Sequence, residues 1–341
     1  MRKWMITSEE ELYKIIGCDR NKFLLIQMIK SSYYGSPIVI KKKNGLRKIY
    51  SPNRLHDLYS IQKKLLQGFL NNIRVSPVTY GFVKKSCYYD FLEPHMDFYK
   101  QNYYLRLDIK DFFDSISGEM IRAAFDYYCD IEDKTEKANT LNVLAEILTY
   151  EDRVVQGTIT APVVSNIVFR SMDIRIERYC SKYHVRYTRY ADDLLFSSES
   201  EKLVKKNFIR GIAKILRSGG FELNYSKVIR SKSYISLNGF VISDTVTLSR
   251  KKLSEINRVL FFLKYKSNIK KVKDGDLSDL NQKIIAETAA ESQRFENNYA
   301  LINYLNGYRA FLISMYKKNS DIKIGRIINE IEEIVAYLLK P

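Results

Sequence analysis

The chain is poor in the residues that build zinc sites and disulfide frameworks. Its 341 residues include only 4 cysteines and 3 histidines. The cysteines, Cys18, Cys87, Cys129 and Cys180, are scattered, without the paired spacing of a metal site or the density of a secreted disulfide scaffold. The histidines offer no zinc constellation either. We therefore expect reduced, structural cysteines and no appended zinc-dependent nuclease domain.

Long apolar runs and phosphate-cradling loops are also missing. No uninterrupted apolar segment is long enough to span a bilayer, and no secretory leader or lipidation motif is present. The Gly-rich loop of P-loop enzymes is absent as well. These absences predict a cytoplasmic protein without a membrane partner.

Positive charge, in contrast, is in surplus. Lys and Arg number 56 against 39 Asp and Glu, a formal net charge of +17. Such a surplus attracts phosphates through counterion release, which favours a nucleic-acid partner. Many of the 26 Tyr and 17 Phe interleave with cations, as in residues 182–187. Aromatic faces beside cations can stack bases, although most of these rings must serve the core.

Adjacent carboxylates stand between two apolar, β-favouring segments at Tyr190-Ala191-Asp192-Asp193. The pattern predicts a strand, a tight turn and a returning strand. An isolated Asp pair is more often a solvated turn, because Asp is a common turn former. A third carboxylate, Asp108, ends a second aromatic and aliphatic strand over residues 103–107. Like charges gathered together favour a bound metal ion.

Three carboxylates of this kind suit two-metal phosphoryl transfer. That chemistry uses two Mg²⁺ ions about 3.5–4 Å apart, one activating an attacking hydroxyl and the other stabilising the leaving oxygen. Asp108, Asp192 and Asp193 converge if their strands are neighbours in one sheet. The arrangement is typical of nucleotide polymerisation.

An ordered series of motifs resembles the reverse transcriptases, and within them the bacterial retron type. The matching segments are residues 44–52 (a fingers hairpin), 81–86, 108–113 (the first catalytic block), 156–162, 190–193 (the second catalytic block), 220–227 and 237–241. The resemblance implies an RNA-directed DNA polymerase that uses two Mg²⁺ ions. It also implies an α+β right-hand fold with fingers, a palm of antiparallel sheet backed by helices, and a helical thumb.

The resemblance assigns roles to individual residues. It implies that Asp108, Asp192 and Asp193 are catalytic. The implied metal ligands are Asp108, Ile109, Asp192 and Asp193. The implied nucleotide-binding residues are Arg47, Lys48, Phe113, Gln156, Gly157 and Lys227. The implied primer and template contacts are Tyr190, Leu237 and Gly239.

Side-chain chemistry is compatible with these roles. Arg47 and Lys48 follow an Asn-Gly turn signal, so a hairpin can carry them toward a triphosphate, with an ordinary basic hairpin as the alternative. Gly157 permits close backbone approach, and the Gln156 amide can contact a nucleotide.

Two further roles have plain alternatives. Phe113 occupies the place of an aromatic that blocks a ribose 2′-OH, and its neighbour Phe112 is expected in the core. Lys227 can neutralise or protonate departing pyrophosphate, or be a surface lysine.

The length favours one multi-lobed polymerase core. We expect N-terminal helices and fingers over residues 1–100, the palm over 101–245, with part of the fingers interleaved, and the helical thumb over 246–341. Locally, the sequence predicts helix over 8–30 with a break at Gly17, a hairpin over 36–50, a helix over 56–74 and a loop over 270–276.

The retron resemblance implies particular partners. These are a structured noncoding RNA, its branched RNA–DNA product primed from a guanosine 2′-OH, dNTPs and an effector protein in antiphage defence; an oligomer is possible. A compact chain without a ribonuclease H or maturase continuation fits this pattern.

Two retron signatures are incomplete in this chain. Of the Asn-Ala-x-x-His signature only His95 is kept, and of Val-Thr-Gly only Gly239. The alternatives are another bacterial defence-associated or group II intron-derived reverse transcriptase without branched priming, a DNA-templated polymerase, and a noncatalytic RNA-binding scaffold.

Overall fold

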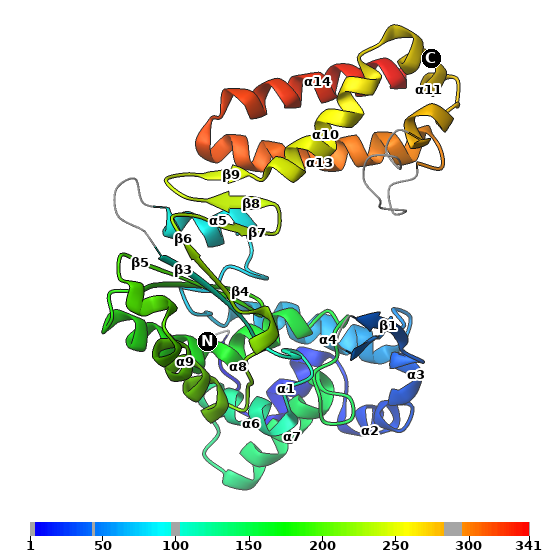
Figure 1. The fold of residues 1–341 in the computed structure, drawn as a ribbon. Helices are drawn as coiled ribbons and strands as arrows, with labels where there is room; N and C mark the ends of the chain where they lie inside the picture. Colours follow the sequence, from blue (N-terminus) through cyan, green and yellow to red (C-terminus); the bar gives the residue numbers. More distant parts are fainter. Residues whose placement is uncertain (1–3, 43–44, 97–102, 283–294, 341) are drawn as a thin grey trace. The chain divides into compact units, whose positions relative to one another are not determined.

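The computed structural model describes residues 4–42, 45–96, 103–282 and 295–340 (Figure 1). Its internal contacts divide the chain into two units. One is Met1–Ile235 with Ile242–Thr245, and the other is Ser236–Val241 with Val246–Pro341. Each unit is described by itself. The fingers, palm and thumb boundaries at residues 100 and 245 stay a prediction.

The chain begins with short capped helices, as the sequence predicts. Helix α1 (Glu9–Ile16) starts where the Ser8 hydroxyl accepts a hydrogen bond from the Glu11 N–H at 3.1 Å. It ends at Gly17, whose φ of 60° places it in the left-handed region that favours glycine. Helices α2 (Arg20–Met28) and α3 (Lys30–Tyr34) follow. The predicted helical segment with a break at Gly17 is confirmed.

The predicted hairpin over 36–50 is confirmed as strands β1 (Ile38–Lys42) and β2 (Gly45–Ile49), which pair antiparallel. Asn44, part of the predicted turn, lies outside the described residues. The predicted helix over 56–74 is too long, because α4 (Asp57–Gly68) is followed by a separate 3₁₀ turn, η1 (Leu70–Asn72). Phe69 and Leu70 are consecutive and both fully buried, which a helix with a single buried face does not accommodate.

A four-stranded antiparallel sheet forms the centre of the first unit. Its strands are β3 (Tyr103–Asp108), β4 (Arg186–Tyr190), β5 (Asp193–Ser198) and β6 (Ile229–Lys232), in the order β4-β5-β3-β6. Strands β4 and β5 form the hairpin predicted around the Asp pair. The Asp108 strand and this hairpin are neighbours in one sheet, since β3 pairs with β5, so the condition for their carboxylates to meet is fulfilled.

One face of the sheet packs in the core and the other carries polar side chains. Side chains alternate between faces along a strand, so Leu105 and Leu107 lie on one face and Arg106 and Asp108 on the other. Leu105 and Leu107 are fully buried in the core cluster that also contains Phe196. The opposite face carries the carboxylates.

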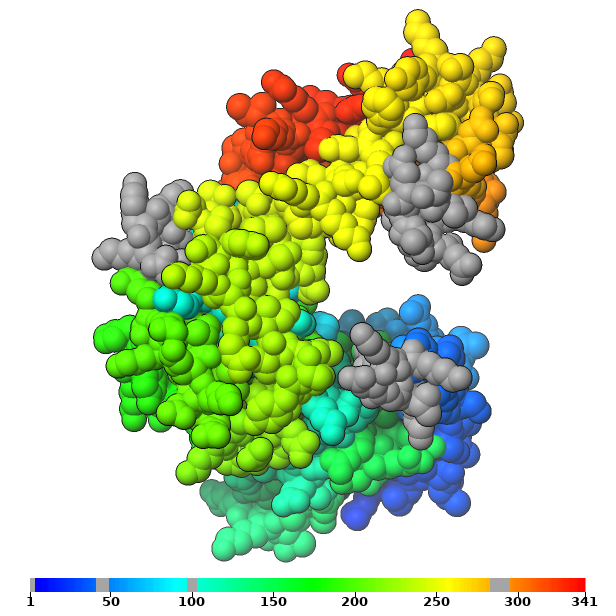
Figure 2. All heavy atoms as spheres, in the orientation of Figure 1, coloured from blue at the N-terminus to red at the C-terminus, as the bar shows by residue number. Residues whose placement is uncertain are grey.

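Helices and short turns surround this sheet. The remaining elements of the first unit are α5 (Tyr88–Leu92), η2 (Glu93–His95), α6 (Gly118–Phe125), η3 (Asp126–Tyr128), α7 (Lys134–Leu148), α8 (Ala161–Ser181), η4 (Glu201–Val204), α9 (Lys206–Ser218) and η5 (Tyr225–Lys227). The first half of helix α8 is largely buried, from Val164 to Phe169. Figure 2 shows the N-terminal helices, in blue, and the central segment, in cyan to green, as one continuous body of packed side chains.

The second unit is mainly helical. Strands β7 (Ile235–Leu237), β8 (Phe240–Ile242) and β9 (Val246–Leu248) form a small sheet at its start. Helices α10 (Arg250–Leu263), α11 (Lys266–Lys273), α13 (Asn298–Asn319) and α14 (Ile322–Leu339) follow. Among the described helices, none combines the length and apolar character needed to cross a bilayer.

The predicted loop over 270–276 is partly wrong. Helix α11 continues to Lys273, and only the last residues of the segment leave the helix, with Gly275 at a φ of 96°. Val272 is almost fully buried and anchors this charged helix. The many lysines of this segment led to the prediction of a loop, because Val272 is its single buried apolar residue.

Gly81 provides a test of how tightly the β4–β5 hairpin is packed. A Cβ atom at this position would lie 2.5 Å from the Ala191 backbone nitrogen. We expect Gly81→Ala to lower the free energy of unfolding by about 1–3 kcal/mol, because backbone cannot yield as a flexible side chain does. Urea unfolding measures this loss. The control, Gly307→Ala in α13, meets nothing within 4 Å and should be neutral or stabilising. Equal stability of the two variants would contradict the packing.

Candidate active site

The register of β3 and β5 brings the predicted carboxylates together. Asp108 lies directly opposite Asp193 in the antiparallel pair, so both side chains share one face of the sheet. Asp192 stands in the turn between β4 and β5, and its carbonyl accepts a hydrogen bond from the Ile109 N–H at 3.0 Å. Asp108 and Asp193 therefore face each other across the strand pair, with Asp192 in the adjoining turn.

The turn itself is held in an unusual backbone conformation. Ala191 has a φ of 56°, in the left-handed region that a non-glycine residue seldom adopts. Gly81 packs directly on this residue. The Gly81 carbonyl accepts a hydrogen bond from the Asn166 side-chain amide at 2.8 Å, which fixes the Gly81 segment to α8. The turn is therefore supported from outside the hairpin.

Asp108 is almost fully buried and has partners from a distant segment. Its Oδ1 accepts a hydrogen bond from the Asn224 side-chain amide at 3.0 Å, and its Oδ2 lies 2.8 Å from the Lys227 Nζ. The Asn224 backbone N–H also donates to the Asp108 carbonyl at 2.8 Å. The segment before β6 thus holds both the backbone and the carboxylate of Asp108.

Arg106 joins the carboxylates of the two strands. Its Nε donates to the Asp193 Oδ1 at 2.9 Å, and its Nη2 lies 3.9 Å from the Asp108 Oδ2. Arg106 precedes Asp108 by two positions, so both point to the same face of β3. The guanidinium offsets the repulsion between two carboxylates placed opposite each other.

Burial and mutual repulsion raise the pKa values of the turn carboxylates. Burial raises the pKa of Asp193 to about 6, against the lowering effect of Arg106. Burial also raises the pKa of Asp192, and the Asp108 charge adds to this. Desolvated carboxylates that repel one another gain from a hard divalent cation, which prefers oxygen ligands. The carboxylates of Asp108 and Asp192 are therefore chemically suited to a hard divalent cation.

Asp193 is less available than Asp108 and Asp192 to bind a metal ion. Its carboxylate is occupied by Arg106. In the part of the chain that the structure describes, no three carboxylate, imidazole or thiolate groups gather closely enough to hold one ion together. The full predicted metal set stays a prediction.

A fully buried ion pair lies on the opposite face of the hairpin. Arg189 on β4 and Asp173 on α8 are both inaccessible to solvent, with Nη2 and Oδ2 2.8 Å apart. Arg189 also donates to the Thr79 hydroxyl, the Asn166 side chain and the Ala191 carbonyl at 2.9, 3.1 and 3.0 Å. One side chain thus ties α8, the segment before Gly81 and the β4–β5 turn together.

Comparison with known families identifies this arrangement. The family described as "Reverse transcriptase (RNA-dependent DNA polymerase)" matches residues 40–242, which contain every carboxylate of the site. The chain belongs to the reverse transcriptase family. The predicted α+β right-hand polymerase fold is confirmed by this match and by the antiparallel sheet with its helices.

Retron enzymes are among its relatives. The chain is 31% identical to the retron Ec86 reverse transcriptase of Escherichia coli over 218 residues, which cover 62% of this chain and 63% of the relative. It is 27% identical to the retron Mx65 reverse transcriptase of Myxococcus xanthus, covering 67% and 55%. The resemblance to the retron type is confirmed. The matches span less than two thirds of these relatives' own lengths.

Solved structures of telomerase also resemble the chain. A telomerase of Candida albicans, solved with a fragment of telomeric RNA, aligns with a TM-score of 0.48 at 13% identity. The alignment covers 89% of this chain and 63% of that one.

The nucleotide-binding residues expected from the reverse transcriptase motifs are only partly brought to the site. Lys227 reaches Asp108. Phe113 is half-buried beside the exposed Phe82, with ring centroids 6.0 Å apart, while Phe112 is in the core as expected. A Cβ on Gly157 would lie 2.5 Å from the Tyr50 carbonyl oxygen, so the predicted close approach is to the chain after the fingers hairpin. The side chains of Arg47 and Lys48 lie outside the described part.

The primer and template candidates differ in accessibility. The Tyr190 ring is half-buried and contacts Tyr88 and Phe91, with centroids 4.9 and 5.8 Å apart. Leu237 is 4% exposed, so its side chain packs inside the protein. Gly239, at a φ of 87°, completes the turn between β7 and β8. The Leu237 side chain is therefore not available to a primer or template strand.

Sequence reasoning missed several residues that hold this reverse transcriptase site. They are Arg106, Asn224, Arg189 and Asp173. Arg106 had a detectable signal, because a cation two positions before Asp108 on a strand must share its face. The roles of the other three depend on residues that are distant in sequence, and no local pattern predicts those contacts.

His95, the remnant of the retron signature, is a buried structural residue. It is fully buried, with Nδ1 2.7 Å from the Ser197 hydroxyl and Nε2 2.8 Å from the Thr188 hydroxyl. Thr188 donates its own proton to the Phe91 carbonyl at 2.9 Å, so the His95 Nε2 must be the donor and Nδ1 the acceptor. The side chain has no face left for RNA and instead fixes the η2 turn to the hairpin.

His95 should make the protein sensitive to mild acid. Burial, aided by the Arg186 charge, lowers the pKa of His95 to about 3 from an ordinary 6.5. Below pH 6.5 the His95 imidazole binds a proton in the unfolded chain but stays neutral in the folded protein. Stability therefore falls as the pH drops from 6.5 toward 3. We expect a loss of about 2 kcal/mol between pH 6.5 and 5, measured by urea unfolding.

Two variants distinguish the contribution of His95 to the acid sensitivity from that of the other titratable groups. His95→Asn should be less stable at pH 7.5 by about 1–3 kcal/mol and lose the acid-dependent part. His184→Asn, at an exposed histidine, should keep the wild-type profile. If His95→Asn retained the full slope, His95 would not be its source.

Proposed function

We propose that the chain is a Mg²⁺-dependent polymerase that copies an RNA template into DNA. The observation that carries the proposal is the pairing of Asp108 with Asp193 across β3 and β5, with Asp192 in the adjoining turn. This constellation lies inside the segment that matches reverse transcriptases. A noncatalytic scaffold has no need of mutually repelling carboxylates, whose burial is costly.

The metal ions would be held by Asp108, Asp192 and the Ile109 carbonyl, with Asp193 nearby on Arg106. When bound, two such ions activate the primer hydroxyl and stabilise the leaving pyrophosphate. Arg106 fixes the Asp193 carboxylate and screens it from Asp108. Arg106 would thereby keep the two carboxylates in place on the sheet between turnovers.

Lys227 is placed to serve the triphosphate. Its side chain is 49% exposed while its Nζ contacts Asp108, so the long, flexible stem can turn from the carboxylate to a phosphate. In that position it would neutralise or protonate the departing pyrophosphate. Asn224 would keep Asp108 oriented when Lys227 leaves.

The remaining predicted residues would select and place the nucleotide. Phe113 would bar a ribose 2′-OH and so favour dNTPs, while its neighbour Phe112 braces it from the core. Arg47 and Lys48 would approach the triphosphate from the fingers hairpin, and Gln156 would contact the nucleotide. Tyr190 and the turn at Gly239 would support primer or template.

Asp192→Asn tests the proposed chemistry. We expect primer extension with dNTPs on an RNA template to fall more than ~100-fold, because even residues that merely support metal ligands contribute 10–100-fold. Asp130→Asn makes the same chemical change at an exposed site and should leave extension intact. Undiminished extension by a folded Asp192→Asn protein would refute the proposal. A matched DNA template identifies the alternative of a DNA-templated polymerase.

We also propose that this activity serves a retron. The kinship with retron reverse transcriptases supports a structured noncoding RNA as template, branched RNA–DNA as product and a defence effector as partner. Nucleic acid that copurifies with the protein should then contain one dominant RNA joined to DNA through a 2′–5′ linkage. Sequencing before and after debranching detects the linkage. Diverse RNAs without attached DNA would point instead to a reverse transcriptase without branched priming.

A further inference from the structure

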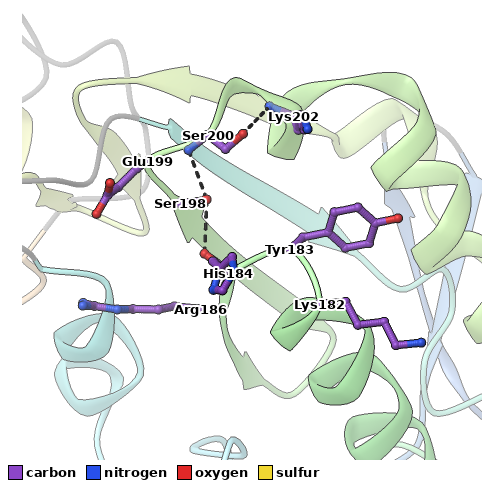
Figure 3. A pocket seen from close by; sticks show the side chains of 8 residues that line it. All are labelled: Lys182, Tyr183, His184, Arg186, Ser198, Glu199, Ser200 and Lys202. Atoms are coloured by element: carbon purple, nitrogen blue, oxygen red, sulfur yellow. Dashed lines mark hydrogen bonds between the residues drawn. The ribbon is translucent and has the colours of Figure 1, made fainter.

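A basic pocket lies at the open end of the β4–β5 hairpin, at the opposite end from the catalytic turn. Its volume is about 580 Å³, and residues from the end of α8, from the starts of β4 and η4 and from the end of β5 line it. The side chains that matter here are Lys182, Tyr183, His184, Arg186, Glu199 and Lys202, shown in Figure 3. They come from two sequence segments that the hairpin pairing brings together.

The pocket carries an excess of positive charge. Lys182, Arg186 and Lys202 supply three cations against one carboxylate, Glu199. Lys182 and Lys202 are exposed, and neither forms an ion pair with any residue in the described ranges. A surplus of cations around one cavity is suited to an anion from outside.

The backbone around the pocket is firmly held. The Ser198 hydroxyl donates to the His184 carbonyl at 3.2 Å and accepts from the Ser200 N–H at 3.1 Å (Figure 3). The Arg186 guanidinium donates to the carbonyls of Pro94 and Met96 at 3.0 and 3.1 Å. The cations therefore project from fixed points, which lowers the entropy lost on binding.

An aromatic ring stands among these cations. Tyr183 is 43% exposed, and Tyr179 and Phe208 lie beside it with ring centroids 5.0 and 5.9 Å away. A braced, exposed ring can stack on a base or sugar next to a bound phosphate. A site for a simple inorganic anion does not require such an aromatic ring.

We propose that the basic pocket binds the phosphodiester backbone of RNA, as a docking site separate from the catalytic turn. The proposal rests on the proposed function for its choice of RNA. Strand geometry supplies the separation, since four residue steps from Arg186 to Tyr190 span about 13 Å. RNA held there is a part of the template molecule that is not being copied at that moment.

The first test compares two double variants with equal loss of charge. Lys182→Gln with Lys202→Gln should raise the Kd for a fluorescent RNA stem-loop about 3- to 10-fold and lower the salt slope by about 1–2. Lys63→Gln with Lys214→Gln removes two exposed lysines elsewhere in the first unit and should change both less. Glu199→Gln should act in the opposite direction and tighten binding about 2-fold. Fluorescence anisotropy from about 50 to 200 mM salt gives these values.

Photocrosslinking locates the contact directly. RNA carrying 4-thiouridine should crosslink to the peptide containing Tyr183, and the pocket double variant should lose that crosslink. If the pocket and control double variants bound RNA alike, or Tyr183 stayed uncrosslinked in the wild type, the proposal would be overturned. An acidic protein would then be the better occupant.

The test is independent of catalysis. RNA binding and crosslinking are measured without dNTPs, so they remain informative even if Asp192→Asn leaves extension intact and the proposed function fails. Conversely, the pocket variant should extend a short primed RNA at the wild-type rate once that substrate is saturating. A lower rate at saturation would place the pocket in the catalytic machinery and contradict a separate docking site.

Discussion

The buried pair of Arg189 and Asp173 is the constraint on which the rest of the site depends. Both charges are fully removed from water, and Arg189 also lies over the Phe169 ring, its guanidinium carbon 4.7 Å from the centroid. Such a pair is weak evidence for stability, yet removing one partner strands the other and costs about 3–5 kcal/mol. What the pair supplies here is position. By donating to the Ala191 carbonyl, Arg189 fixes the turn in which Asp192 stands.

A second buried polar anchor works on the other face of the same hairpin. Because neighbouring side chains alternate, Thr188 points away from Arg189 and meets His95, which also bonds Ser197 on the partner strand. The hairpin is therefore held from both sides by groups that cannot slide without losing buried hydrogen bonds. A one-residue slip would place every side chain on the wrong face, including Asp193. The polar anchors make that slip costly and so keep Asp193 opposite Asp108.

Local sequence was sufficient for the strands that carry the carboxylates. Apolar and aromatic β-favouring residues around Asp192 and before Asp108 predicted these strands, and the carboxylates were expected to meet if the strands were neighbours in one sheet. The sequence was less informative where function depends on distant partners. Arg189 resembles a surface cation in a basic chain, since burial beneath α8 is visible only in three dimensions. His95 was identified only as the kept residue of a retron signature, and both of its ring nitrogens serve the fold. For Gly157 the close approach was foreseen, but its partner, the Tyr50 backbone, was not.

The electrostatics of the site then follow from its neighbours. Three carboxylates face two cations, Arg106 and Lys227, so the catalytic face keeps a net negative charge within a chain whose formal charge is +17. Arg189 adds nothing to this balance, because Asp173 cancels its charge at contact distance. A small negative region in a positive surround attracts divalent cations to the turn while phosphates are drawn to the surrounding surface. The basic pocket belongs to that surround, at the hairpin end farthest from the carboxylates, where a phosphate is not repelled by them.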